Sequence, residues 1–263
     1  MRVFINQDIE RIDVYDERYY IKNKLENIYY TSCTHVISTQ KGMGEQLKQF
    51  FMDYGNQAKL IAQRAAESGS KVHDMIDRMN KGENLIWEES KYSLEEWQGA
   101  LKYRKFVELV KPKIECSEHI ALCDTLKYGC TIDLICMING ERWLIDHKFS
   151  KGVYDSGYIQ LAANKNAWDE QYPDYKIDRV GILWLKAHTK TERKDKIQGK
   201  GWQLVEPINV HSKYTHENLF NEFSKLIETF YYYNPNPKPK TYSLPLKLNV
   251  PEEYLGKPIL KTA

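Results

Sequence analysis

The middle of the chain constrains the fold more than any other part. It holds three runs that are rich in apolar and β-branched residues, Lys113–Leu122, Thr131–Ile138 and Arg142–Phe149. Asn139 and Gly140 separate the last two runs, and this dipeptide favours the tight turn of a β-hairpin. The sequence therefore predicts three consecutive strands, of which the last two form a hairpin.

Helical patterns lie on both sides of these strands. Ser93–Val110 is predicted to form a helix that begins with a capping box, because Glu96 follows Ser93 at the required spacing. Residues 217–232 are predicted to form an amphipathic helix. The other predicted elements are a helix over 43–80 interrupted near Gly55 and Gly69, a helix over 156–171, strands over 3–5, 11–14, 19–21, 28–30, 179–185 and 201–205, a Lys-rich hairpin loop over 186–200 and an extended tail after Asn234.

The order of these elements indicates the fold class. Helices, three strands, a helix and a further strand (αβββαβ) are typical of an α/β or α+β fold with a central mixed β-sheet flanked by helices. The N-terminal β-hairpin and the additional helices would extend that core. We expect a single domain over residues 1–263, with N-terminal strands in 1–42, a helical part in 43–112, the core in 113–206 and a helix with an extended tail in 207–263.

Charge, hydropathy and cysteine content exclude several classes of protein. The net charge is only +2, so a nucleic-acid site would depend on local clusters of Lys and Arg. No apolar stretch is long enough to span a membrane, and residues 1–10 lack the apolar segment of a signal peptide, so we expect a cytoplasmic protein without a membrane partner. The five cysteines lack Cys-x-x-Cys spacing, which favours buried, reduced thiols over an iron–sulfur cluster.

The predicted hairpin places two aspartates side by side. Counting outward from a two-residue turn at Asn139 and Gly140 pairs Asp133 with Asp146 on the neighbouring strand. Lys148 follows Asp146 by two residues and therefore points to the same face of the sheet. The sequence thus predicts two opposed carboxylates with an ammonium group beside them.

A third carboxylate joins this pair if residues 124–127 form a four-residue loop, because Glu118 then faces Asp133. Like charges that are opposed in an apolar sheet destabilise it. A bound Mg²⁺ or Mn²⁺ would remove the conflict, since both ions prefer carboxylate oxygens, and it could activate water for attack on a phosphate. The alternative is that the aspartates are solvated strand ends and that Lys148 is their salt-bridge partner.

The ordered set of polar residues resembles the PD-(D/E)XK nuclease superfamily, and within it the RecB-like branch. The N-terminal strands and the segment Tyr30–Thr34 are similar to phage exonucleases related to the mitochondrial genome maintenance exonuclease, and the resemblance extends over roughly residues 10–206. The residues that carry it are Asp133, then Asp146-His147-Lys148 after the hairpin, Gln160 in the next predicted helix, and Gly69-Ser70-Lys71-Val72-His73, which looks like the Gly-x-x-x-His motif of that branch.

The resemblance implies a restriction-endonuclease-like core and a set of metal ligands. Asp133 and Asp146 resemble the metal-binding acids of the family, and His73 resembles a histidine ligand that reaches the metal from a helix. The backbone carbonyl of His147 resembles a further ligand. The imidazole of His147 points away from Asp146 in the predicted strand, so we expect it to be packed or paired and not to bind metal.

Other matching residues are expected to act around the metal. Lys148 resembles the catalytic lysine, Gln160 resembles a glutamine that positions the site or the DNA backbone, and Glu118 resembles an upstream acid found in many members. The chain departs from the pattern at Asn164, where the branch often has Tyr, and at Cys130, where it often has Gly. Neither departure removes a metal ligand.

These features lead us to expect a metal-dependent DNA exonuclease. It would use one or two Mg²⁺ or Mn²⁺ ions and act on single strands or DNA ends, in phage or bacterial DNA replication, recombination or repair. A structure-specific (flap) endonuclease, a catalytically weak DNA-binding partner in a recombination complex, and an RNA nuclease remain open alternatives.

Two kinds of surface segment could contact the DNA. The Lys-rich segments 186–200 and 238–240 could bind phosphates or form solvated loops, and the Tyr-rich segments 19–20, 29–30 and 231–233 could stack on bases or line the core.

Overall fold

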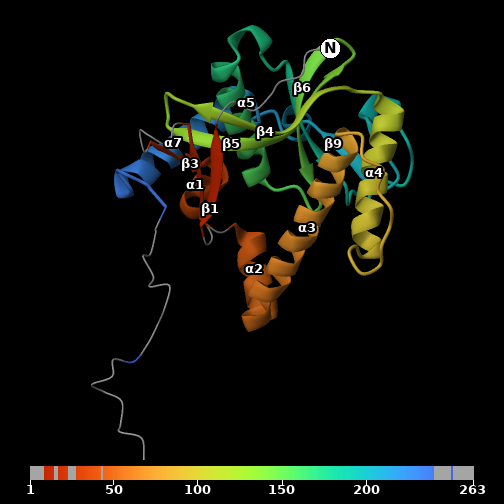
Figure 1. Ribbon diagram of the computed structural model, residues 1–263, viewed down its shortest axis with the longest axis horizontal. Helices are drawn as coiled ribbons and strands as arrows, with labels where there is room; N and C mark the ends of the chain where they lie inside the picture. Colours follow the sequence, from red (N-terminus) through yellow and green to blue (C-terminus); the bar gives the residue numbers. More distant parts are fainter. Residues whose placement is uncertain (1–8, 15–16, 23–27, 43, 240–249, 251–263) are drawn as a thin grey trace, which may run out of the picture.

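The computed structural model describes residues 9–14, 17–22, 28–42, 44–239 and 250. The predicted strand over residues 3–5 and most of the predicted tail therefore lie outside the described residues. The remainder is a mixed α/β structure built on one β-sheet with helices on both faces (Figure 1). This confirms the predicted fold class at the level of a mixed sheet flanked by helices.

The sheet contains parallel and antiparallel neighbours in the order β1-β2-β3-β5-β6-β7-β9-β8, and β4 pairs with β5 off this path. The pairs β3–β5 and β6–β7 are parallel, and the other pairs are antiparallel. The strands are β1 (Glu10–Val14), β2 (Glu17–Ile21), β3 (Tyr29–Ser32), β4 (Lys113–Cys123), β5 (Tyr128–Ile138), β6 (Glu141–Lys148), β7 (Arg179–Trp184), β8 (Gln198–Gly199) and β9 (Trp202–Val205).

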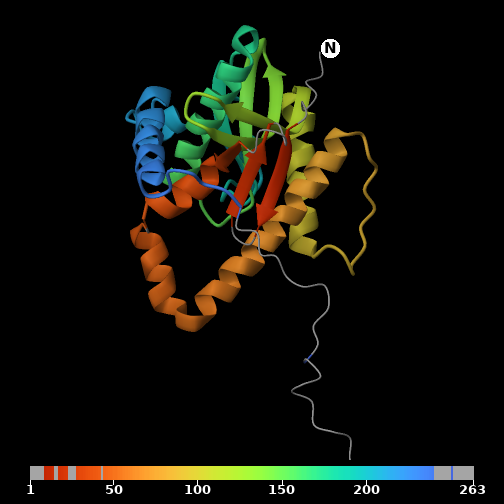
Figure 2. The ribbon, with the colours of Figure 1, turned by 60° about the vertical axis from the view of Figure 1, so that its left-hand side comes forward.

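The helices cover the two faces of the sheet as two separate groups. Residues of α1, α5 and α7 form one hydrophobic core with the sheet, and residues of α3 and α4 form another. The helices are α1 (Cys33–Gln40), α2 (Glu45–Tyr54), α3 (Ala58–Asn80), α4 (Leu94–Val110), α5 (Asp155–Gln171), α6 (Pro207–Val210) and α7 (His216–Tyr233), with short 3-10 turns at Gly55–Gln57, Pro173–Tyr175 and Lys194–Lys196. The two groups are separated by the central strands (Figure 2).

The predicted hairpin is confirmed in its register. Ile138 pairs with Glu141 across a turn in which Asn139 and Gly140 both have positive φ, at 52° and 88°. Asn-Gly adopts positive φ at both positions readily, and the resulting turn matches the twist of the two strands. The predicted four-residue loop before β5 is also confirmed, because Cys123 pairs with Tyr128.

The sheet forks within β5. Strand β4 occupies one edge of β5 along almost its whole length. The other edge is shared, because β6 pairs with Leu134–Ile138 whereas β3 pairs with Tyr128 and Gly129. Between these two partners the edge of β5 is open, and Asp133 lies at the point where β6 departs.

The alternation of side chains also changes at Asp133. Ile132 belongs to the core under α5, but Leu134, two residues later, belongs to the core under α3 and α4. In a regular strand these two side chains would share one face. The opposite strand is irregular at the same level, where Glu118 has a positive φ of 47°. The central carboxylate therefore sits at an irregular point that the regular pairing on either side holds in place.

The N-terminal half differs from the predictions in two places. The segment 1–42, predicted to hold N-terminal strands, also contains the helix α1 (Cys33–Gln40), which was not predicted and whose residues Cys33, Val36 and Ile37 are buried. Tertiary packing against α5 and α7 outweighs the strand preference of its β-branched residues. The expected interruption near Gly55 is present, whereas α3 runs without a break through Gly69, because one glycine costs a long helix only about 1 kcal/mol.

The remaining elements follow the predictions with small differences. The capping box of Ser93 and Glu96 is present at the start of α4. The segment 186–200 is more ordered than a simple loop, since it contains a 3-10 turn and β8. The helix α2 and the first part of α3 project away from the sheet (Figures 1 and 2).

All five cysteines are buried and unpaired, as predicted. Among the residues that the structure describes, no helix combines the length and the apolar character needed to cross a membrane.

Candidate active site

The predicted polar residues converge at the fork of the sheet. They come from five elements: His73 from α3, Glu118 from β4, Asp133 from β5, Asp146, His147 and Lys148 from β6, and Gln160 from α5. Every one of them contacts another member of the set, in two groups that the backbone of β6 joins: His73, Glu118, Asp133 and His147 form one group, and Asp146, Lys148 and Gln160 form the other. The structure thus brings together all the residues that the sequence singled out.

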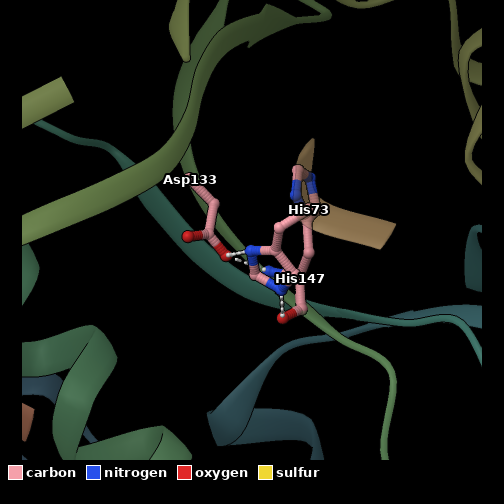
Figure 3. A group of neighbouring side chains, drawn as sticks. All are labelled: His73, Asp133 and His147. Atoms are coloured by element: carbon pink, nitrogen blue, oxygen red, sulfur yellow. Dashed lines mark hydrogen bonds and ion pairs between the residues drawn. The ribbon is translucent and has the colours of Figure 1, made fainter. Parts of the chain in front are cut away.

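His73 is placed by the packing of α3 against the sheet. Its neighbours Val72, Met75 and Ile76 are buried in the core beneath α3 and α4, which turns the His73 side chain toward the strands. Its Nε2 donates a hydrogen bond to the backbone carbonyl of His147 at 2.9 Å, and its Nδ1 lies 3.6 Å from Asp133 Oδ2 (Figure 3). His73 therefore faces two other predicted metal ligands, the backbone carbonyl of His147 and the carboxylate of Asp133.

Asp133 closes the end of the β5–β6 ladder with its side chain. The last paired residues are Leu134 and Ile145, in the predicted register, so the ladder ends one residue before Asp133 and Asp146 and these two are not a ladder pair. Instead, Asp133 Oδ2 accepts a hydrogen bond from the backbone N–H of His147 at 2.7 Å (Figure 3). The carboxylate takes the place of a backbone acceptor where the two strands separate.

The environment of Asp133 favours its charged form. Burial alone would raise its pKa, but the charge and hydrogen bond of His73 outweigh this effect, and the pKa lies well below its usual range. The same interactions raise the pKa of His73 well above its ordinary value, against the lowering effect of burial. Without a metal ion, Asp133 and His73 are therefore a mutually stabilised ion pair.

Asp146 has the opposite electrostatic character. Burial, together with the charge of Asp133, raises the pKa of Asp146 to about 6, although the charge of Lys148 acts in the opposite direction. Lys148 Nζ lies 2.8 Å from Asp146 Oδ2 and donates to Gln160 Oε1 at 3.1 Å. The predicted same-face relation of Asp146 and Lys148 is confirmed, and Gln160 fixes the ammonium group from the other side.

Glu118 reaches the site from an unusual backbone position. Its Oε1 lies 3.8 Å from His73 Nδ1, and its side chain remains about one-third exposed. A non-glycine residue with positive φ costs roughly 1–3 kcal/mol, which neighbouring structure must supply. The regular pairs on either side of Glu118, Ser117 with Leu134 and His119 with Ile132, provide that support.

The imidazole of His147 is placed differently from the simple expectation. It is buried against the rings of Tyr103 and His73, as predicted. However, side-chain ligand atoms of His73, Asp133 and His147 all lie within 4.8 Å of one another, so the ring of His147 is a further candidate ligand. Strand alternation could not indicate this, because it places the ring on the face opposite to Asp146 without showing that His73 approaches that face.

A small hollow opens beside Lys148. It has a volume of about 40 Å³, and its lining includes Lys148, Ser150, Tyr154 and Gly157. Gly157 fits closely here, because a Cβ there would lie 3.1 Å from Ile182 Cδ1 and 3.7 Å from Lys148 Cε. The start of α5 therefore lies next to the ammonium group, with open space between them.

The donor set fits a hard divalent cation. It offers carboxylates from Asp133, Asp146 and Glu118, a backbone carbonyl from His147 and an imidazole from His73, and oxygen-rich sets of this kind suit Mg²⁺ or Mn²⁺. The raised pKa of Asp146 is the cost of a buried carboxylate beside another one, and a cation would relieve it. Chemically, the arrangement can bind a cation next to a fixed ammonium group and an open hollow.

Comparison with known proteins adds little to this geometry. No protein-family model matches the chain, and no curated protein matches it. A crystal structure described as LHK-Exo in complex with dAMP shows a distant similarity, with 10% sequence identity, a TM-score of 0.31 and coverage of 78% of this chain and 93% of that chain. A likeness at this level carries no argument about fold or function.

Proposed function

We propose that this protein is a metal-dependent nuclease that hydrolyses phosphodiester bonds in DNA. The observation that carries the proposal is the convergence, at the fork of the sheet, of Asp133, His73 and the backbone carbonyl of His147 beside the ion pair of Asp146 and Lys148. The proposal includes a restriction-endonuclease-like core, for which the chain order α4-β4-β5-β6-α5-β7 is the supporting observation, and a single domain that carries the activity.

Asp133, Asp146, His73 and the carbonyl of His147 would hold one or two Mg²⁺ or Mn²⁺ ions. A bound ion would supply an activated water and neutralise charge on the phosphate that is attacked. His73 must be neutral to act as a ligand, so its raised pKa implies that cation binding releases a proton. The ring of His147 is already neutral, because burial lowers its pKa to about 4.

Lys148 provides the fixed positive charge of the site. Burial alone would lower its pKa, but the charge of Asp146 overcomes this effect and raises the pKa, so the side chain stays an ammonium group. Asp146 and Gln160 hold it at the edge of the hollow, where it can donate a hydrogen bond to a phosphate oxygen. Charge builds on that oxygen during hydrolysis, so a fixed donor lowers the barrier.

The substrate that we propose is single-stranded DNA or a DNA end, cleaved as an exonuclease. The hollow beside Lys148 is small and supports binding of one phosphate group at this point, and the choice of substrate follows from the resemblance of Asp133, Asp146 and Lys148 to the motifs of phage exonucleases. The described part of the chain offers no observation that favours cleavage within a strand, so we treat endonuclease action as an outcome of the test.

The test is cleavage of a labelled linear single strand beside its circular form, with Mg²⁺, Mn²⁺ or EDTA. We expect metal-dependent loss of the linear strand alone. Asp146→Asn should reduce the rate by at least about a thousandfold, whereas the matched control Asp74→Asn, an exposed residue of α3, should retain it. Lys148→Ala and its exposed neighbour Lys151→Ala form a second pair with the same expected contrast.

Each other outcome changes the assignment. Loss of both linear and circular DNA would make the protein an endonuclease, and preferential loss of RNA would make it an RNA nuclease. Tight DNA binding without cleavage under any of these conditions would replace the nuclease with a DNA-binding partner. Equal activity of wild type and Asp146→Asn would show that the chemistry lies elsewhere.

A further inference from the structure

Three lysines gather on the α4 side of the sheet, next to the candidate active site. Lys102 and Lys105 lie one turn apart on α4, and Lys186 follows the end of β7. The charges of Lys186 and Lys105 both act on Lys102, and together with burial, which is the largest cause, they lower the pKa of Lys102. Lys102 is therefore close enough to both Lys105 and Lys186 for their charges to repel its own.

The structure holds two of these lysines in fixed positions. Lys102 Nζ donates a hydrogen bond to the backbone carbonyl of Leu185 at 2.8 Å. Gly201 makes room for it, since a Cβ at Gly201 would lie 2.9 Å from Lys102 Cε, and its φ of +80° suits glycine. Lys186 Nζ lies 4.0 Å from the centre of the Phe149 ring, in a cation–π contact.

The same contacts connect the lysines to the catalytic strand. Phe149 follows Lys148 directly, and the backbone N–H of Leu185 donates to the carbonyl of Lys148 at 2.9 Å. Lys186, the residue after Leu185, therefore lies at the ends of β6 and β7, where Lys148 also lies. On the other side of Lys102, Tyr103 packs against the ring of His147. The cluster is thus in direct continuity with the site.

In the described part of the chain, one acid, Glu95, is placed against this cluster. Glu95 pairs with Lys186 at 2.8 Å and is the acid that acts on Lys102, but its own side chain is 68% exposed. Exposed ion pairs of this kind contribute little and exchange readily with other anions. Three cations held near each other with one weakly held acid have a net attraction for an external polyanion.

From this geometry we propose that Lys102, Lys105 and Lys186 form a docking surface for the phosphate backbone of the DNA strand beyond the cleavage site. The inference rests on the proposed nuclease function and assigns the direction in which the strand leaves the metal centre, across α4 and the end of β7. Lys186 is the contact nearest to Lys148, and Lys105 is the most distant and most exposed of the three. Binding to this surface depends on the charge of the phosphates and not on the base sequence.

The test is equilibrium binding of a labelled single-stranded oligonucleotide in EDTA, measured at several salt concentrations. Each phosphate contact contributes roughly 0.7 to the slope of log affinity against log salt for a single strand. The double variant Lys105→Ala/Lys186→Ala should therefore reduce the slope by about 1.4 and weaken binding at ~0.1 M salt by on the order of tenfold or more. The control Lys176→Ala/Lys225→Ala removes two exposed lysines elsewhere, near the end of α5 and on α7, and should leave the slope unchanged.

A single exposed substitution guards against a folding defect. Lys105→Glu leaves the cation–π contact and the hydrogen bond to Leu185 intact, and it should still lower the slope. If the wild type cleaves DNA but the Lys105 and Lys186 variants bind it with an unchanged salt slope, the proposed docking surface is wrong and the proposed nuclease function stands. A reduced slope in a protein that never cleaves would support the surface and overturn the nuclease. Failure of the wild type to bind DNA at all would overturn the surface, whatever the cleavage assay shows.

Discussion

The two halves of the candidate site place an aspartate in opposite electrostatic environments. On one half, Asp133 accepts the N–H of His147 and lies beside His73, and its pKa is lowered. On the other half, Asp146 is more deeply buried and lies beside a second carboxylate, and burial raises its pKa to about 6 despite the ion pair with Lys148. The protein therefore satisfies one aspartate by itself and leaves the other in electrostatic conflict.

This difference distinguishes a residue that stabilises the fold by itself from a residue whose charge is stabilised when a cation binds. Asp133 replaces a ladder bond where the sheet forks, so it contributes to folding. Asp146 costs free energy in the protein alone, and that cost is recovered when a cation shields the two carboxylates from each other. We expect substitutions on the two halves to differ in sign, and three measurements can break or sharpen this comparison.

The largest expected effect is stabilisation of the wild type by divalent cations. A ligand that binds only the folded protein adds about 2.7 kcal/mol at a hundredfold excess over its Kd. For a chain of this length this corresponds to a rise of roughly 5–10 °C in Tm. The measurement is thermal unfolding with Mg²⁺, Mn²⁺ or EDTA.

The variants decide where that cation binds. Asp146→Asn and Asp133→Asn should each remove most of the rise in Tm, while Asp74→Asn should keep it. An identical rise in all four proteins would place the cation outside the proposed site, and the absence of any rise in the wild type would contradict the donor set itself.

A smaller effect with opposite signs is expected in EDTA near pH 8. Asp146→Asn removes a buried charge that the fold disfavours, so it should stabilise the protein by on the order of 2 kcal/mol. Asp133→Asn removes a charge that His73 and the His147 N–H stabilise, so it should destabilise the protein by a similar amount. Denaturant unfolding at constant m-value measures both changes.

The pH dependence gives this prediction a second check. Because the folded pKa of Asp146 is raised to about 6, its favourable contribution is complete below about 3.8 and is lost as the pH rises through 6. The advantage of Asp146→Asn over wild type should therefore shrink as the pH falls from 8 toward 4. Because the pKa of Asp133 is lowered, its carboxylate stays ionised and stabilises the fold between pH 8 and 4. The lower free energy of unfolding of Asp133→Asn relative to wild type should therefore persist through this range. Parallel behaviour of the two variants would contradict the division into two halves.

Sequence patterns predicted the parts of this site that local rules control. The two-residue turn at Asn139 and Gly140 determines the register of β5 and β6, so counting outward from it placed the two aspartates within one step of their observed relation. The two-residue spacing of Asp146 and Lys148 placed both side chains on one face. Where a turn or an alternation determines geometry, the sequence is sufficient.

The fork was not predictable from the sequence, because residues two apart in a strand normally point to the same face of the sheet and here they do not. Ile132 and Leu134 flank Asp133 with the spacing of ordinary strand alternation, yet they lie in different cores. At this point β3 and β6 pair with different parts of one edge of β5, an arrangement that no local sequence pattern indicates. The helix α1 was missed for a similar reason, since packing of Val36 and Ile37 against α5 and α7 overrides their preference for strands.

The smallest expected effect concerns Gln160, which acts on the Asp146 half through Lys148. Its Oε1 accepts from Lys148 Nζ at 3.1 Å, but Asp146 holds the same ammonium group at 2.8 Å. Gln160→Ala should therefore lower kcat by about tenfold, equivalent to about 1.4 kcal/mol, with little change in KM, because Lys148 keeps its charge but loses one constraint. Gln160→Glu keeps an acceptor at the same position and should recover part of the rate, and the exposed Gln63→Ala on α3 serves as the control. A loss as large as that of Lys148→Ala would mean that Gln160 contacts the reacting atoms itself, whereas an unchanged rate would show that Asp146 alone positions the lysine.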